Sequence, residues 1–268
     1  MPNYDEPHVS VVLTTRDRPR FLAIALRNYA AQTYSNRELI VVDDGLDFPV
    51  DERMIRDLGG RLVRQPNGST IGAKLNAGIE IARGPLCQKM DDDDWYASNF
   101  LETMVNRRLR AETNFCHPTM TFVMPFLFFE LSAWEIRRSI PNNVPGATLM
   151  FDRDDWRDRP FRNLAQDEDV WYFRDHRRLG RAFTPVEDVD IFLAVRHHGA
   201  TGDRGHTWTH QHGRQTLEQY LQSRPLHECQ PADLLPEWGL RAYREIRARM
   251  IARDVAEPDV SESEGLTS

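Results

Sequence analysis

The chain lacks the features that mark secreted, disulfide-bonded or membrane-spanning proteins. Its three cysteines (Cys87, Cys116 and Cys229) are odd in number and far apart, so they do not form a disulfide framework. The N-terminal residues contain neither the basic nor the apolar region of a signal peptide. The most hydrophobic stretch, 121–131, is about half of the ~20 residues that span a bilayer. We therefore expect a cytoplasmic protein in a reducing compartment.

Lysine is also scarce, because Lys74 and Lys89 are the only two in the 268 residues. The net charge of −7 excludes a broad nucleic-acid-binding surface, although not a local basic patch. With 40% hydrophobic residues the chain can build a sizeable core, which excludes a wholly disordered protein. Both lysines fall in segments that are interpreted below as functional.

Strand and helix patterns alternate along the first hundred residues. Asp17 is expected to cap the first helix, and Ser69 or Thr70 the second. This alternation predicts βαβ units with right-handed crossovers, and hence a parallel sheet with helices on both faces. The apolar runs expected to form strands are 9–13, 39–42, 61–64 and 86–90.

The second half of the chain has a less regular α+β pattern. The sequence predicts a short strand at 148–151, a helix at 169–179, a strand at 191–195 and a helix within 240–251. From residue 254 onward the chain is acidic and short of apolar residues, which is typical of a frayed tail.

Polar motifs follow three of the expected strands, at Thr14-Thr15, Asp43-Asp44 and Asp91 to Asp94. In parallel α/β sheets, ligands bind at the carboxyl ends of the strands, so these motifs are expected to converge on one site. Four consecutive aspartates repel one another, which raises their pKa values unless a cation or solvent offsets the charge. Such hard oxygen ligands suit Mg²⁺ or Mn²⁺.

Two other interpretations of the aspartate run were weighed. A solvated acidic turn that caps a helix starting near Ser98 stays open as an alternative. A calcium-binding loop does not fit, because Trp95 and Tyr96 stand where such a loop needs an oxygen ligand and a glycine.

Four segments resemble successive motifs of the family-2 glycosyltransferases. They are VSVVLTTRDRPRFLAIAL, ELIVVDDG, GAKLNAGIEIARGP and KMDDDDWY, in that order. The resemblance covers about residues 8–110 and, more loosely, 145–210. It implies an α/β protein of the GT-A fold, with a mostly parallel central sheet flanked by helices and a C-terminal helical extension.

The resemblance implies a nucleotide site on the first half of the chain. Thr14 would line the pocket near the base and ribose, and Asp44 would accept a hydrogen bond from the base. Lys74 and Asn76 stand where the family contacts the nucleotide. The alternatives are an Asx turn for Asp43 or Asp44, and a solvated surface charge for Lys74.

The aspartate run resembles the DxD signature of the family. By this resemblance Asp93 ligates Mn²⁺ or Mg²⁺, while Asp91 or Asp92 holds the ribose or a metal-bound water, with Asp91 a second candidate metal ligand. The metal would bridge the two phosphates and neutralise the leaving diphosphate. Asp94 is expected to cap the next turn.

An inverting glycosyltransferase also needs a general base for the acceptor hydroxyl. The family places this acid before a Trp- and Arg-containing helix, where this chain has Asp167, Glu168 and Asp169. Position before Trp171 favours Glu168 or Asp169, and a helix-capping role stays open for at least one of the three. Gly146 is expected to let the backbone approach the acceptor, with Trp171 also on the acceptor side.

A histidine-rich segment follows the expected catalytic region. Arg204 to Trp208 resembles a His-x-Trp element of some relatives, in which the histidine adds a metal ligand. By this resemblance His206 is a candidate metal ligand, and Trp208 is a candidate for packing on a sugar ring. A hydrogen-bonded histidine, or zinc held by His206, His210 and His212, are the alternatives.

The resemblance therefore implies a metal-dependent inverting transfer of a sugar from a UDP-, dTDP- or GDP-type donor. The acceptor is a hydroxyl of a glycan, a lipid-linked molecule or a small molecule. Residues 1–215 would form the catalytic domain (about 1–115 for the nucleotide and 116–215 for the acceptor), followed by a helical extension at 216–253 and a flexible tail at 254–268.

Other functions and locations stay open at this stage. The alternatives are a sugar-phosphate nucleotidyltransferase and a catalytically inactive sugar- or nucleotide-binding module. The arginine-rich segment 241–253 is typical of a solvated helix face, and less often of a helix on an anionic membrane. Peripheral contact with the inner membrane face is therefore kept as an alternative to a wholly cytoplasmic location.

Overall fold

The computed structural model describes residues 6–112, 118–139, 145–197 and 217–256. The strands are β1 (Val9–Thr15), β2 (Arg37–Asp43), β3 (Arg61–Arg64), β4 (Leu86–Asp91), β5 (Trp95–Tyr96), β6 (Pro118–Val123), β7 (Leu127–Glu130), β8 (Glu135–Arg138), β9 (Met150–Asp152), β10 (Ala182–Val186) and β11 (Phe192–Arg196). The helices are α1 (Pro19–Ala30), α2 (Glu52–Arg56), α3 (Ile71–Glu80), α4 (Phe100–Glu112), α5 (Arg153–Asp158), α6 (Glu168–Arg178), α7 (Leu217–Gln222), α8 (Pro231–Leu234) and α9 (Glu237–Ala256), with 3₁₀ turns η1 (Gly146–Thr148) and η2 (Val189–Ile191).

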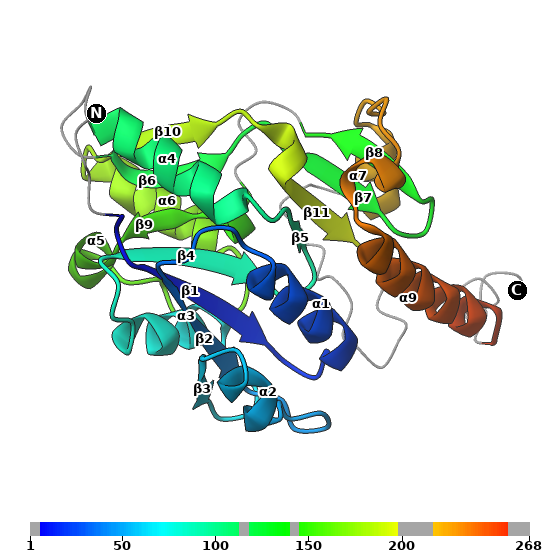
Figure 1. The fold of residues 1–268 in the computed structure, drawn as a ribbon, viewed down its shortest axis with the longest axis horizontal. Coiled ribbons are helices and arrows are strands. Elements are labelled where there is room, and N and C mark those ends of the chain that lie inside the picture. The colour runs from blue at the N-terminus through cyan, green and yellow to red at the C-terminus, as the bar shows by residue number, and fades with distance from the viewer. Residues whose placement is uncertain (1–5, 113–117, 140–144, 198–216, 257–268) are drawn as a thin grey trace, which may run out of the picture.

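The central sheet has seven strands in the order β10-β6-β9-β4-β1-β2-β3. β1 is parallel to both β2 and β4, and β2 is parallel to β3. β9 runs antiparallel to its two neighbours, β4 and β6. The predicted α/β fold with a mostly parallel sheet is confirmed, and the carboxyl ends of β1 and β4 point toward the side that holds β11 and α9 (Figure 1).

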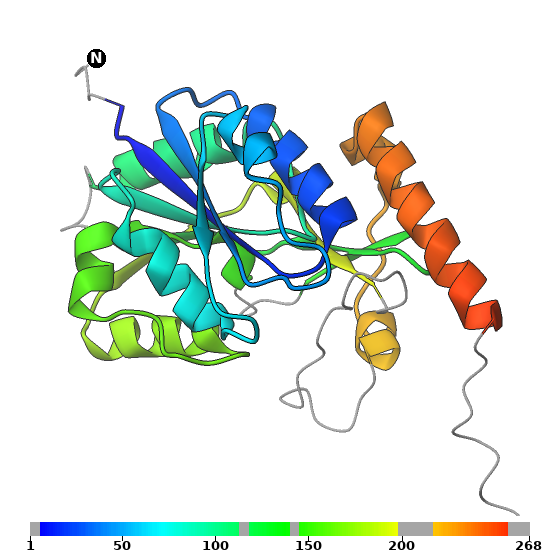
Figure 2. The same cartoon turned by 90° about the horizontal axis from the view of Figure 1, so that it is seen from below.

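Helices cover both faces of this sheet (Figure 2). Alternate residues of β1 face opposite ways: Val11 and Leu13 pack with α1, α2 and α4, whereas Val12 packs with α3 and residues after it. The apolar face of α1 that the sequence predicts, which includes Leu22 and Leu26, lies in the first of these clusters. Burial on both faces explains the continuous apolar runs of these strands.

A second sheet, with the order β5-β11-β7-β8, was not predicted from the sequence. The hydrophobic stretch 121–131 is divided between the two sheets, since β6 belongs to the first and β7 to the second. β4 ends at Asp91 in one sheet and β5 begins at Trp95 in the other. The aspartate run therefore lies at the junction of the two sheets.

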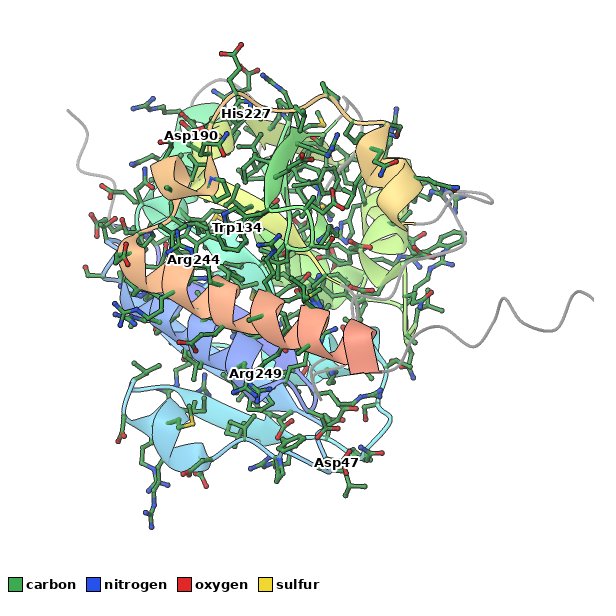
Figure 3. The ribbon with its side chains drawn as sticks, turned by 90° about the vertical axis from the view of Figure 1, so that its right-hand side faces the viewer. Asp47, Trp134, Asp190, His227, Arg244 and Arg249 are labelled. Carbon is green, nitrogen blue, oxygen red and sulfur yellow. The ribbon has the colours of Figure 1, made fainter. Side chains whose placement is uncertain are left out.

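The arginine-rich helix α9 packs against the second sheet through Leu240, Tyr243 and Ile246. Its arginines contribute to this packing: Arg247 donates to the carbonyl of Ser132 at 2.9 Å. Figure 3 shows Arg244 beside Trp134, with its guanidinium 5.8 Å from the ring centre. Within the described ranges, no helix combines the length and apolar character needed to cross a membrane.

The structure decides between the capping predictions. Asp17 does not cap α1: Arg18 is the N-cap residue, and Asp17 has a φ of 54°. The Asp17 carboxylate instead accepts hydrogen bonds from the backbone N–H groups of Asp47 and Phe48, both at 2.9 Å. Asp17 thereby ties the loop after β1 to the loop after β2.

Thr70 is the N-cap of α3, as predicted, and accepts from the backbone N–H of Ala73 at 3.1 Å. Its hydroxyl also donates to the side-chain oxygen of Asn163. We expect Thr70→Ala to lower the free energy of unfolding by about 1 kcal/mol, because the cap is lost.

Thr70→Ser is the matched control, since its hydroxyl can make both bonds, and chemical denaturation measures both variants. Equal stability of the alanine variant and the wild type would contradict the assigned cap.

Candidate active site

The predicted motifs meet at the carboxyl ends of three neighbouring strands. Thr15, the last residue of β1, pairs with Asp43 at the end of β2. Thr14 pairs with Asp91 at the end of β4. The convergence that the sequence predicted is therefore confirmed, and Thr14 lies buried between the β2 and β4 ends.

Asp44 forms a buried charge pair at one end of the site. Lys74 of α3 places its Nζ 2.7 Å from Oδ1 of Asp44 and 3.1 Å from the carbonyl of Thr15. The other oxygen of Asp44 accepts from the backbone N–H of Gly68 at 3.1 Å, and lies 3.4 Å from Nε of Arg16. The interpretation of Lys74 as a solvated surface charge is wrong, because the side chain is buried.

Asp43 has a different role from its neighbour. Its carboxylate accepts hydrogen bonds from the backbone N–H groups of Gly45 and Val50, both at 2.8 Å, and pairs with Arg64. A carboxylate that binds the N–H two residues on forms an Asx turn. The alternative that one acid of the pair holds the turn is thus confirmed for Asp43, and Asp44 faces Lys74.

Each of the first three aspartates of the run has a cationic partner. Asp91 lies 2.9 Å from Nζ of Lys89, two residues earlier on β4. Nη1 of Arg18 lies 2.9 Å from Oδ1 of Asp92 and 2.9 Å from Oδ2 of Asp93. One guanidinium nitrogen thus bridges two carboxylates, and the interpretation of the run as a solvated acidic turn is wrong.

Asp94 does not cap the turn that follows it. Its carboxylate accepts from the backbone N–H of Val195 at 2.8 Å and lies 3.6 Å from Nη1 of Arg196. Both partners are on β11, about 100 residues later in the chain. This aspartate therefore joins the end of β4 to the second sheet.

Burial governs the electrostatics of the run. It raises the pKa of Asp92, and the Asp93 charge adds to this, while the Arg18 guanidinium acts in the opposite direction. Burial likewise raises the pKa of Asp94, helped by Asp93 and opposed by Arg196. Burial lowers the pKa of Arg18, but Asp92 and Asp93 outweigh it and the net shift is upward. The guanidinium is therefore firmly charged.

Lys89 connects the aspartate run to the acids of α6. Its Nζ lies 3.5 Å from a carboxylate oxygen of Glu168 as well as 2.9 Å from Asp91. Burial, with help from the Asp169 charge and against Lys89, raises the pKa of Glu168 to about 7. Burial also raises the pKa of Asp169, with Lys89 again opposing it. The three predicted acids start α6, with Asp167 as its N-cap residue.

The packing of Asp169 against Gly146 requires a glycine at this position. It lies in the 3₁₀ turn η1 and not in a strand, and a Cβ built on it would meet Oδ2 of Asp169 at 1.7 Å. Asp169 thus occupies the space that a side chain at position 146 would fill. Position 146 must be glycine for this carboxylate to lie where it does.

Two further predicted residues make contacts of their own. The amide of Asn76 accepts from Nε1 of Trp156 at 2.8 Å and donates to the carbonyl of Phe161 at 2.8 Å, so it fastens α3 to α5 and to the chain after it. The ring of Trp171 is covered by the guanidinium of Arg162, 4.0 Å from the ring centre.

His206 and Trp208 lie outside the described residues. Two residues that were not predicted do lie at the site: Nε2 of His197 is 3.3 Å from Oδ2 of Asp93, and the Tyr243 hydroxyl is 3.5 Å from the Asp93 carbonyl. The His197 ring is buried and stacks on Phe21. No local sequence signal connects either residue to Asp93.

Comparison with known proteins identifies the family. The family model described as glycosyl transferase family 2 matches residues 10–156, just over half of the chain. The chain belongs to glycosyl transferase family 2.

Curated relatives match over a shorter region. The glycosyltransferase GlyG of Streptococcus pneumoniae serotype 4 is 31% identical over 100 residues, which are 36% of this chain and 33% of GlyG. The putative glycosyltransferase EpsH of Bacillus subtilis is 31% identical over 105 residues, which are 38% of this chain and 30% of EpsH. The match thus spans about a third of the length of each relative.

Solved structures share the fold. Mannosyltransferase PcManGT from Pyrobaculum calidifontis, in complex with GDP-Man and Mn²⁺, matches with a TM-score of 0.55 and 17% identity over 96% of this chain and 66% of that one. S. aureus TarS 1–349 in complex with UDP matches with a TM-score of 0.54 and 16% identity over 70% of this chain and 60% of that one. The predicted GT-A fold is confirmed.

The raised pKa of Glu168 predicts a dependence of stability on pH. Because this carboxyl titrates at about 7 when folded and near 4.5 when unfolded, the folded state holds more protons between these values. Its contribution to stability is therefore full below pH 4.5 and is lost as the pH rises through 7. Glu168→Gln removes this loss, so its stability relative to the wild type should rise by about 1–3 kcal/mol from pH 4.5 to pH 8.

Chemical denaturation at both pH values measures this difference. Glu80→Gln, at the exposed end of α3, is the control and should track the wild type. A Glu168→Gln variant that also tracks the wild type at both pH values would refute the shifted carboxyl.

Proposed function

We propose that the chain transfers a sugar from a nucleotide-diphosphate donor to an acceptor hydroxyl, with inversion and with Mn²⁺ or Mg²⁺ bound. The observation that carries this proposal is the link through Lys89, which lies between Asp91 of the donor-side run and Glu168 of the acceptor side. Family membership supports the reaction class. The complexes of relatives in fold with UDP and with GDP-Man support a nucleotide-sugar donor.

The nucleotide base is assigned to the Asp44 end of the site. A buried carboxylate that accepts from a base N–H makes a selective, charge-assisted hydrogen bond. Lys74 and the Gly68 N–H hold Asp44 in place, at 2.7 Å and 3.1 Å from its two oxygens. The ribose and diphosphate would then extend past Thr14 toward Asp91 and Asp92. UDP-, dTDP- and GDP-type donors are all compatible with this arrangement.

The aspartate run fits a divalent cation that is completed by substrate. Within the described part of the chain, no group of three or more His, Cys, Asp or Glu side chains is arranged to hold a metal ion. Mg²⁺ is commonly held by only one or two carboxylates together with substrate phosphates. Arg18 shows that positive charge is already accommodated between Asp92 and Asp93. Asp93 and Asp91 would hold the cation, which when bound neutralises the leaving diphosphate.

His197 is assigned to orienting Asp93 and not to the cation itself. Its Nε2 lies 3.3 Å from Oδ2 of Asp93, while its ring is fixed by stacking on Phe21. Partners of this kind hold a ligating carboxylate in its working orientation.

Asp169 is assigned as the general base. Glu168 is buried against Lys89, whereas Asp169 is half-buried and lies against Gly146 of η1. The acceptor oxygen attacks the anomeric carbon as Asp169 takes its proton, and the bond from that carbon to the diphosphate oxygen breaks. The products are the glycosylated acceptor and the nucleoside diphosphate. Lys89 and Glu168 would position this acid relative to the donor.

The halves of the catalytic domain follow from these assignments. Residues 1–115 supply Asp44, Lys74 and the aspartate run, and 116–215 supply Gly146 and the acids of α6. The acceptor class, whether glycan, lipid-linked or small molecule, stays open, as does contact with a membrane surface.

Calorimetric titration of UDP, dTDP, GDP and CDP with and without Mn²⁺ tests the donor site. We expect one nucleotide to bind more tightly with Mn²⁺ than without it. Asp93→Asn should reduce the Mn²⁺-dependent affinity by at least the ~10–100-fold that outer-shell partners of metals contribute. Asp154→Asn, whose side chain is 87% exposed, is the control. Folded wild-type protein that binds none of the four nucleotides would refute the proposed function.

The base is tested by two amide variants, once an acceptor is found. Asp169→Asn should lower kcat by about 10²–10⁴-fold, because proton transfer is lost, with donor affinity unchanged. Asp167→Asn is the neighbouring control and should retain most of the activity. If Asp169→Asn stays fully active, the base lies elsewhere. Donor binding without turnover in the wild type, across an acceptor screen, would favour an inactive binding module.

A further inference from the structure

Arg18 occupies a central place among the aspartates of the site. Its Nη1 is 2.9 Å from a carboxylate oxygen of Asp92 and 2.9 Å from one of Asp93, and only 18% of its side chain is exposed. Thr15 supports the arrangement by donating to the second oxygen of Asp92 at 2.7 Å. The guanidinium therefore lies against the carboxylate that is assigned to the cation.

The backbone beneath Arg18 is fixed although its side chain is long. Asp17, with its φ of 54°, is anchored by the N–H groups of Asp47 and Phe48, and α1 begins at Pro19. Any change in the position of the guanidinium must therefore come from rotation of the side chain. Arginine has enough rotatable bonds to reach a neighbouring anion from a fixed backbone.

A divalent cation at Asp93 and the guanidinium of Arg18 would compete for the same oxygens. Two cations within a few ångströms repel each other, so the metal alone binds against the Arg18 charge. A diphosphate changes this balance, because its oxygens accept the planar fork of arginine in pairs. The guanidinium could then exchange carboxylate oxygens for phosphate oxygens while the metal takes Asp93.

We propose that Arg18 holds the place of the cation between Asp92 and Asp93 and turns to the donor diphosphate when metal and nucleotide enter together. This inference rests on the proposed function. Arg18 is thereby assigned as a diphosphate-binding residue that makes metal binding depend on the nucleotide. By linkage, the metal must increase the affinity for the nucleotide by the same factor by which the nucleotide increases the affinity for the metal.

The test is a Mn²⁺ titration of wild-type protein and Arg18→Gln, with free Mn²⁺ followed by electron paramagnetic resonance. It is done without nucleotide and with a saturating amount of the nucleoside diphosphate that binds the wild type. We expect Arg18→Gln to bind Mn²⁺ alone about tenfold more tightly than the wild type, because the competing charge is gone. The gain in Mn²⁺ affinity on adding nucleotide should shrink by about tenfold or more, and nucleotide affinity should fall.

Arg20→Gln is the matched control, because it removes the same charge two residues later, where Arg20 lines a groove with Trp238 of α9. It should leave both Mn²⁺ affinities unchanged. Arg18→Lys keeps the charge without the fork and should lie between the wild type and Arg18→Gln. It also serves as the test variant if Arg18→Gln does not fold.

Thermal denaturation gives a second measurement that needs no activity. Without nucleotide, Mn²⁺ should raise the Tm of Arg18→Gln more than that of the wild type. The proposal is overturned if the wild type binds nucleotide with Mn²⁺ but the Arg18 variants have the same Mn²⁺ affinity as the wild type and the same gain in Mn²⁺ affinity when nucleotide is added. A wild type that binds no nucleotide under any condition overturns the proposed function itself, and this inference with it.

Discussion

The structure depends on the burial of three consecutive carboxylates, Asp92 to Asp94, next to the half-buried Asp91 at the junction of its two sheets. Uncompensated, each would be strongly destabilising, because a buried charge without a partner costs about 3–5 kcal/mol. The partners come from separate parts of the chain: Lys89 from β4, Arg18 from the start of α1, and Arg196 with the Val195 N–H from β11. Satisfying this run therefore fixes the position of β11, and with it the second sheet, relative to the carboxyl end of β4.

The same arrangement connects the two sides of the proposed reaction. Lys89 is shared between Asp91 and Glu168. The charges of Asp91 and Lys89 therefore both act on the pKa of Glu168 in α6. Asp169 follows Glu168 directly and fits against Gly146, which the chain reaches just before β9. β9 is the strand that pairs antiparallel with β4. The pairing of β9 with β4 thus places the acceptor side next to the strand that ends in the aspartate run.

The local parts of the fold and site could be predicted from the sequence, and the long-range parts could not. Apolar runs predicted β1, β2 and β4, and the preference of helices for a hydroxyl at the N-cap predicted the role of Thr70 in α3. These signals lie within a few residues of the element that they predict. The convergence of strand ends followed from parallel topology alone. The pairings of Arg18 with Asp93, and of His197 with Asp93, join residues 75 and 104 positions apart, and no periodicity encodes them. The second sheet was missed because its strands also come from distant parts of the chain. One of them, β5, has only two residues, which is too short for a recognisable pattern.

The only two lysines of the chain both lie at the site. Both lysines of the chain are buried, Lys74 against Asp44 and Lys89 against Asp91 and Glu168, whereas Arg18 bridges Asp92 and Asp93 with 18% of its side chain exposed. The compact ammonium of each lysine lies against one set of oxygens, whereas the planar fork of Arg18 can exchange one pair of oxygens for another. Under the proposed exchange, Lys74 and Lys89 keep their carboxylate partners while Arg18 changes its own.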